Sequence, residues 1–98
     1  MSNLPIRKLN PMIQCRDGFE ISVQSHQDSY SQRDEFGKLL SVECGFPNEK
    51  PTTKKLQEFA ELCGTDDYTK TVYPYTPIEV IKAELELHGG IYDGCLPE

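Results

Sequence analysis

Residues 72–91 have the sequence VYPYTPIEVIKAELELHGGI and predict one helix with both of its ends. Thr76 can serve as the N-cap, Pro77 occupies the first helical position, and Glu79 stands three residues after the cap. This arrangement is a capping box, with the proline placed where its missing N–H has no consequence. The Gly89-Gly90 pair then supplies a left-handed stop. We therefore expect a helix that begins at Pro77 and ends at about residue 88.

The predicted helix is apolar over more than half of its circumference. At about 100° per residue its apolar side chains form two stripes, with Glu84 between them. The stripes are Ile78, Ile81, Leu85 and His88 on one side, and Val80, Ala83 and Leu87 on the other. A helix this widely apolar packs on two neighbours, or on one neighbour and a partner molecule. We expect either a homodimer or a well-covered helix in which Glu84 pairs with a base.

The N-terminal half predicts an antiparallel sheet. A hairpin is expected over residues 12–24, because Asp17-Gly18 is a strong turn signal and the residues after it alternate between apolar and polar. Residues 40–46 alternate again and give a third strand, which Pro47-Asn48 ends. Between them, residues 25–37 are polar and aperiodic, which favours a functional loop or a wide hairpin connection.

A second helix is expected to begin after Thr52 or Thr53 and to run to Cys63, where Gly64 stops it. Residues 71–75 look extended, but Pro74 confines them to a sheet edge or to no pairing. Residues 91–92 can start a last short strand.

The predicted fold class is α+β: a small antiparallel sheet of three to four strands, with two helices packed on one face. The elements follow the order β-β-β-α-(β)-α-β. Residues 1–11 form an N-terminal arm, and residues 12–98 form a single domain of a size that can bury a modest core.

The net charge of −6 is spread unevenly along the chain. Residues 1–16 carry three bases and no acid, whereas residues 17–98 carry seven bases and sixteen acids. An acidic body disfavours direct binding to nucleic acid and favours a basic partner or simple solubility. No run approaches the roughly 20 apolar residues of a membrane span, and the N-terminus lacks the apolar core of a signal peptide. We therefore expect a cytoplasmic location and no membrane partner.

The four cysteines do not form a metal-binding pattern. Cys15, Cys44, Cys63 and Cys95 include no close pair, so we expect reduced thiols, no metal and no cofactor. His88, in the last turn of the predicted helix, suits the negative end of the helix dipole. One alternative remains open: a small thiol- or metal-dependent enzyme that uses Cys44 or Cys63 with His26.

Two polar loops place acids beside aromatic residues, as in many surfaces that bind basic proteins. Acids steer the encounter, and aromatic side chains supply contact area after docking. The predicted partner-binding residues are Tyr30, Asp34, Glu35 and Phe36 in the first loop, and Asp66, Asp67 and Tyr68 in the second.

Three segments, GFEISV (18–23), VECGFP (42–47) and YPYTPIEVIKAELELHGG (73–90), resemble small accessory proteins encoded by bacteriophages and prophages. The resemblance implies a protein that binds and disables a host protein, such as a CRISPR effector or another defence complex. Its motifs are structural, so no functional residue is carried over. The leading hypothesis is thus a non-catalytic inhibitor that acts through an acidic surface. A structural or assembly protein that self-associates, through an exposed sheet edge or the helix expected at residues 77–88, is a further alternative.

Overall fold

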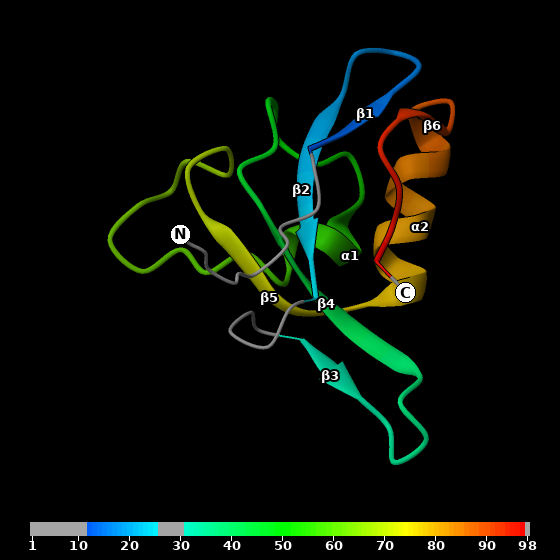
Figure 1. Ribbon diagram of the computed structural model, residues 1–98. Helices are drawn as coiled ribbons and strands as arrows, with labels where there is room; N and C mark the ends of the chain where they lie inside the picture. The colour runs from blue at the N-terminus through cyan, green and yellow to red at the C-terminus, as the bar shows by residue number, and fades with distance from the viewer. Residues whose placement is uncertain (1–11, 26–30, 98) are drawn as a thin grey trace, which may run out of the picture.

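A computed structural model describes residues 12–25 and 31–97 of the chain, so the predicted arm at residues 1–11 lies outside the described residues. The elements are β1 (Ile13–Cys15), β2 (Glu20–Gln24), β3 (Gln32–Arg33), β4 (Leu39–Gly45), α1 (Lys54–Gln57), β5 (Val72–Pro77), α2 (Ile78–Leu87) and β6 (Ile91–Asp93) (Figure 1). The predicted α+β class is confirmed. The predicted count of three to four strands is wrong, because the described residues form six.

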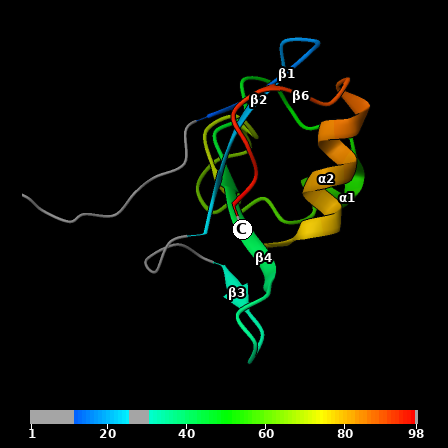
Figure 2. The same ribbon diagram turned by 45° about the vertical axis from the view of Figure 1, so that its right-hand side comes forward.

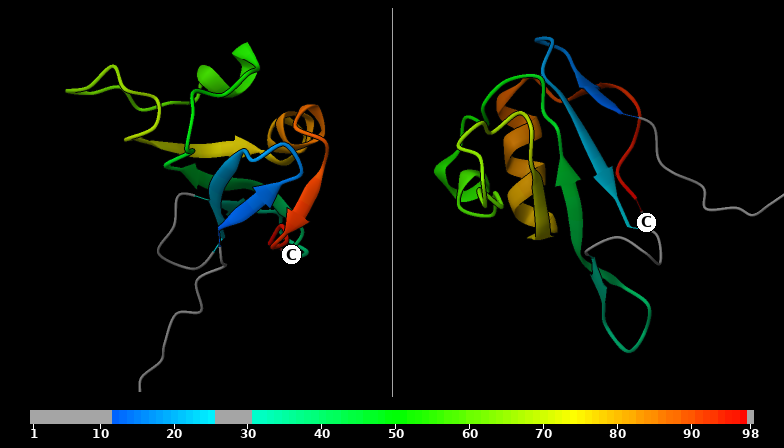
Figure 3. Two further views of the ribbon diagram at one scale, coloured as in Figure 1. Left: turned by 90° about the horizontal axis from the view of Figure 1, so that it is seen from above. Right: turned by 90° about the vertical axis from the view of Figure 1, so that its left-hand side faces the viewer.

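Strand β4 is the centre of the sheet, and every pairing is antiparallel. Cys44 pairs with both Val23 of β2 and Tyr73 of β5, so these two strands lie on opposite sides of β4. Ser41 pairs with both β3 and β5, so β2 and β3 follow one another along the same side. From β2 the sheet continues to β1 and then to β6. Helix α2 lies across one side of this sheet, with α1 beside it (Figures 2 and 3).

The hairpin over residues 12–24 is confirmed. The Cys15 N–H donates to the Phe19 carbonyl at 2.8 Å, and the Asp17 carboxylate accepts from the Phe19 N–H at 3.0 Å. Gly18 closes the turn with a φ of 98°, in the left-handed region that glycine enters without strain. The strand predicted at residues 40–46 is confirmed as β4.

The missed strand is β3, inside the segment expected to be a functional loop or a wide hairpin connection. Its two residues, Gln32 and Arg33, are both exposed, so they carry no apolar alternation that could reveal a strand. Strand β3 forms a hairpin with the first half of β4, and the turn between them is Asp34–Lys38.

The core lies between the sheet and the helices. Side chains from the β1–β2 hairpin, β4, β5, α1 and α2 meet there. They are Ile13, Cys15, Phe19, Ile21, Val23, Val42, Cys44, Leu56, Tyr73, Ile81 and Leu85. Of the alternating apolar residues expected at 40–46, only Val42 and Cys44 are buried. Leu40 and Phe46, the first and last of them, are exposed, and Phe46 follows the end of β4.

The predicted capping box is wrong. Thr76 belongs to β5, where it pairs with Val42, and its buried hydroxyl donates to the Tyr73 carbonyl at 2.9 Å. The N-cap of α2 is Pro77, which makes no side-chain capping bond. Because the strand runs directly into the helix, the hydroxyl faces the core instead of the first helical turn. The predicted end is confirmed: Gly89 and Gly90 have φ values of 88° and 85°.

Helix α1 begins as predicted but ends much earlier than Cys63. Its N-cap is Thr53, whose hydroxyl accepts from the Leu56 N–H at 3.2 Å, and the helix has only four residues. After it, the Glu61 N–H donates to the Val72 carbonyl at 2.9 Å, and Thr71 donates to the Glu61 carbonyl. These bonds hold the chain against the start of β5, so the helix cannot continue. The prediction that Pro74 confines its segment to an edge is confirmed, because β5 pairs with β4 alone among the described strands.

Candidate functional site

The β3–β4 hairpin extends away from the rest of the molecule and ends in a tightly bonded turn (Figures 1 and 2). One carboxylate oxygen of Asp34 accepts from the Phe36 N–H at 2.9 Å and from the Lys38 N–H at 2.8 Å. Backbone bonds join Asp34 N–H to the Lys38 carbonyl at 2.9 Å and Gly37 N–H to the Asp34 carbonyl at 3.0 Å. The Arg33 guanidinium donates to the Gly37 carbonyl at 2.8 Å. This turn, Asp34–Lys38, is the hairpin tip, and hydrogen bonds among residues 33–38 hold its backbone in place.

This turn presents an aromatic side chain to solvent. Phe36 is 87% exposed, which makes it the most exposed large apolar residue in the described part of the chain. Glu35 beside it is exposed as well. The structure thus brings three predicted site residues together, but Asp34 holds the turn, whereas Glu35 and Phe36 point their side chains outward. Tyr30, predicted with them, lies outside the described residues.

In the second predicted loop, Asp67 and Tyr68 make contacts within the protein itself. The Asp67 carboxylate accepts from the Thr69 N–H at 2.9 Å and from its hydroxyl at 2.6 Å, and these bonds lower the pKa of Asp67. The Tyr68 ring lies under the Lys50 ammonium at 4.8 Å, and the Tyr68 carbonyl accepts from the Tyr73 hydroxyl at 2.6 Å. Of this trio, Asp66 is the residue with an exposed side chain.

The two loops do not form one surface. The hairpin tip lies at one extremity of the molecule, and the loop containing residues 66–68 lies at another (Figures 1 and 3). A single partner patch that includes both would have to span the body of the protein. The tip is the better candidate because its apolar and acidic side chains are exposed together.

A buried charged network lies toward the C-terminal end of α2, and its residues are not among the predicted site residues. The Glu84 side chain is 0% exposed and accepts from the Thr52 N–H at 2.7 Å and the Thr53 N–H at 2.9 Å. One ring nitrogen of His88 lies 2.8 Å from Glu84, and the other lies 2.7 Å from Asp17. The ring stacks on Phe19 at a centroid distance of 4.0 Å. The base that pairs with Glu84 is therefore four residues away on the same helix.

The network ties three segments together instead of offering a reactive group. Both nitrogens of the imidazole face carboxylates, so the ring has no free position to take a proton from a substrate. It joins α2 to the β1–β2 turn through Asp17 and to the start of α1 through Thr52 and Thr53. The prediction that His88 serves the helix dipole misses these contacts.

The hydrogen bonds of the network shift its pKa values in opposite directions. For His88, burial disfavours the charged ring, but the bonds to Asp17 and Glu84 outweigh it and raise the pKa above 6.5. For Glu84, burial opposes ionisation, but the Thr52 and Thr53 N–H groups and His88 outweigh it and lower the pKa below 4.5. For Asp17, the bond from the Phe19 N–H and the pairing with His88 lower the pKa.

We expect stability to be greatest between about pH 4.5 and 6.5 and to fall on both sides. The raised pKa of His88 contributes stability below the ordinary value of 6.5, and this is lost as the pH rises through the folded-state pKa. The lowered pKa of Glu84 contributes stability above 4.5, and this is lost as the pH falls. Urea unfolding at pH values below 4.5, between 4.5 and 6.5, and above 6.5 measures both limbs. In His88→Gln the alkaline limb should flatten, and an unchanged alkaline limb would contradict the assignment.

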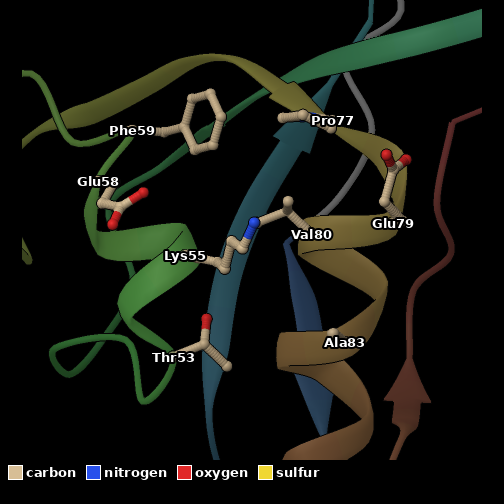
Figure 4. A pocket seen from close by; sticks show the side chains of 8 residues that line it. All are labelled: Thr53, Lys55, Glu58, Phe59, Pro77, Glu79, Val80 and Ala83. Atoms are coloured by element: carbon tan, nitrogen blue, oxygen red, sulfur yellow. The ribbon is translucent and has the colours of Figure 1, made fainter.

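A shallow groove of about 430 Å³ lies between α1 and α2. Phe59, Pro77, Val80 and Ala83 line it with apolar surface, and the Lys55 side chain extends across it toward Val80 (Figure 4). The expected second stripe of α2 is only partly covered here. Val80 is half-buried, but Ala83 is exposed and Leu87 is 61% exposed. The described residues thus cover this stripe only in part, and a homodimer through it stays a prediction.

Two of the four thiols, those of Cys15 and Cys44, are buried and placed poorly for nucleophilic chemistry. All four cysteines are free, and burial raises the pKa of Cys44 to about 12. Burial also raises the pKa of Cys15, whereas Cys63 is exposed. His26, the base in the enzyme alternative, lies outside the described residues. In residues 12–25 and 31–97 no cluster of three or more His, Cys, Asp or Glu side chains is suited to a metal ion.

No helix in the described part of the chain could cross a membrane. Comparison with protein families, with curated proteins and with solved structures finds no match to this chain.

Proposed function

We propose that this protein is a non-catalytic binding module that recognises a basic surface of another protein through the tip of its β3–β4 hairpin. The observation that carries the proposal is Phe36, which is 87% exposed on a turn held by the Asp34 carboxylate. An aromatic side chain held open to water on an ordered turn gains free energy when a partner covers it.

The order of the turn favours tight binding. A flexible loop loses conformational freedom when it docks, and this loss reduces the affinity. Here the bonds from Asp34 and Arg33 fix the backbone before any partner arrives. Phe36 can then act as an anchor in a pocket of the partner, while Glu35 next to it steers the approach to a basic surface.

The resemblance to phage accessory proteins adds the class of partner. We propose a host protein, namely a component of a defence complex such as a CRISPR effector, which the module inhibits in the host cytoplasm. Basic surfaces are common in such complexes because they bind nucleic acid. Inhibition would follow from occupying that surface. A direct contact of this chain with nucleic acid is not part of the proposal, because the net charge is −6.

The test uses the wild-type protein to capture a partner from host lysate, after which the partner is identified, purified and titrated. Phe36→Ser is expected to weaken binding by about 2 kcal/mol, a factor of roughly thirty, because an anchor residue is lost. The Phe36 side chain is not part of the core, so the urea midpoint of the variant should stay unchanged. Glu35→Lys should mainly slow association, and more strongly at low salt.

Tyr92→Ser is the matched control. Tyr92 is 72% exposed on β6, away from the hairpin, and its loss should leave the affinity unchanged. If Phe36→Ser binds like the wild type while Tyr92→Ser binds weakly, the contact surface is not the hairpin tip. Asp34→Lys is avoided, because it would break the turn as well as change the charge.

A further inference from the structure

A second hollow, of about 610 Å³, lies between the β3–β4 hairpin, α2 and the C-terminal segment. Among the described residues its charged lining consists of Arg33, Lys38 and Lys82, with no acid beside them. This is unusual for a chain with sixteen acids and ten bases. We propose that this hollow binds an acidic peptide segment of another protein, in which carboxylates alternate with apolar side chains.

The cations come from both walls of the hollow. Arg33 and Lys38 belong to the hairpin, and Lys82 projects from the middle of α2. Lys82 also lines two adjoining hollows of about 320 Å³ each, so it stands where the three meet. Acids enter only in those neighbours, as Glu79 in one and Glu86 in the other. The positive charge is thus concentrated in the central hollow.

The floor between these cations is apolar. Leu39 of β4, Ile78 of α2 and Leu96 of the C-terminal segment line the hollow, and all three are half-buried against the core. A free phosphate or a sugar would leave this surface uncovered. A peptide with leucine between glutamates would place its carboxylates near the lysines and its apolar side chains on the floor. The hollow is open on one side, which suits an extended segment more than an enclosed small molecule.

This site adjoins the hairpin tip, because Gly37 and Lys38 of the Asp34–Lys38 turn line it, but its surface does not include the exposed side chains of Glu35 and Phe36. Phe36 does not line the hollow, so the proposal does not depend on the proposed function. The two surfaces should also attract partners of opposite charge, since Glu35 at the tip favours a basic partner whereas Lys38 and Lys82 in the hollow favour an acidic one.

The probe is a fluorescein-labelled peptide, Gly-Glu-Leu-Glu-Leu-Glu-Gly, titrated with the full chain by fluorescence anisotropy. Lys38→Gln and Lys82→Gln should each weaken binding about two- to fivefold, and the double variant about tenfold, because each removes one exposed ion pair. Binding should weaken further as salt is added. Replacing the glutamates of the peptide by glutamine should weaken it about tenfold, and replacing its leucines by serine should weaken it as well.

Lys54→Gln is the matched control, because Lys54 is an exposed lysine of α1 that lines none of these hollows. It should bind the peptide like the wild type, as should Phe36→Ser. The proposal is overturned if the wild type gives no saturable binding, or if Lys54→Gln weakens binding as much as Lys82→Gln. It is also overturned if a single-stranded oligonucleotide displaces the peptide and binds more tightly than it does.

Discussion

Replacing Glu84 by alanine should lower the free energy of unfolding by about 3–5 kcal/mol, the cost of breaking a buried ionic network from one side. The side chain is 0% exposed and accepts from Thr52 N–H, Thr53 N–H and His88. Its removal leaves two backbone donors without their acceptor and takes from His88 one of the carboxylates that stabilise its charge. Because small domains have only about 5–15 kcal/mol of stability in total, much of the variant could unfold.

Urea unfolding at pH 6 measures this effect, and two further variants control it. Glu84→Gln keeps the shape of the side chain but presents an amide donor, and we expect a smaller loss of about 2 kcal/mol. Glu86→Ala, on the exposed side of the same helix, should change stability by no more than about 0.5 kcal/mol. A loss at Glu84→Ala that is no larger than that at Glu86→Ala would show that the network does not stabilise the fold.

Thr76→Asp is the second variant with a large expected effect, a loss of about 3 kcal/mol. Thr76 is buried in β5, so the new carboxylate would be placed in the core without a cation to pair with it. If Thr76 were the N-cap of α2, as the capping box predicts, the same substitution would not lower the stability, because aspartate is among the best N-cap residues and suits the helix dipole. The same substitution therefore separates the two descriptions of the strand–helix junction.

The measurement is the urea midpoint of Thr76→Asp, compared with that of Thr76→Val. The valine variant fits the same space and loses the hydroxyl, which donates to the Tyr73 carbonyl and also interacts with the Cys44 thiol, so it should cost about 1 kcal/mol. If Thr76→Asp proves as stable as the wild type, Thr76 caps α2 after all.

Local signals were enough to predict several elements. The Asp17-Gly18 turn, the glycines after α2 and the Thr53 cap each depend on bonds between residues close in sequence. Such bonds form in the same way in many folds, so the residues themselves indicate them.

The parts of the fold that were not predicted depend on contacts between residues far apart in the sequence. Helix α1 stops early because Glu61 bonds to Val72, which no local pattern announces. Strand β3 has two exposed residues and is a strand only because β4 lies beside it. The residues around Thr76 are compatible with a helix cap and with a strand, and packing in the core favours the strand.

The candidate site was predictable in part. Asp34, Glu35 and Phe36 were placed in a binding loop, but the turn they form depends on bonds across to Lys38. For the buried network, Glu84 and His88 are four residues apart on one helix, and that spacing could have indicated a pair. Asp17 is 71 residues away from His88, and nothing in the sequence links the two.

The most direct test of the central claim is photo-crosslinking from the hairpin tip. A benzophenone amino acid replaces Phe36 in one variant and Tyr92 in another, and each is irradiated with the identified partner. We predict a crosslinked product from position 36, competed away by unlabelled wild type, and little or none from position 92. Crosslinking from position 92 with none from position 36 would contradict the assignment of the hairpin tip as the binding surface.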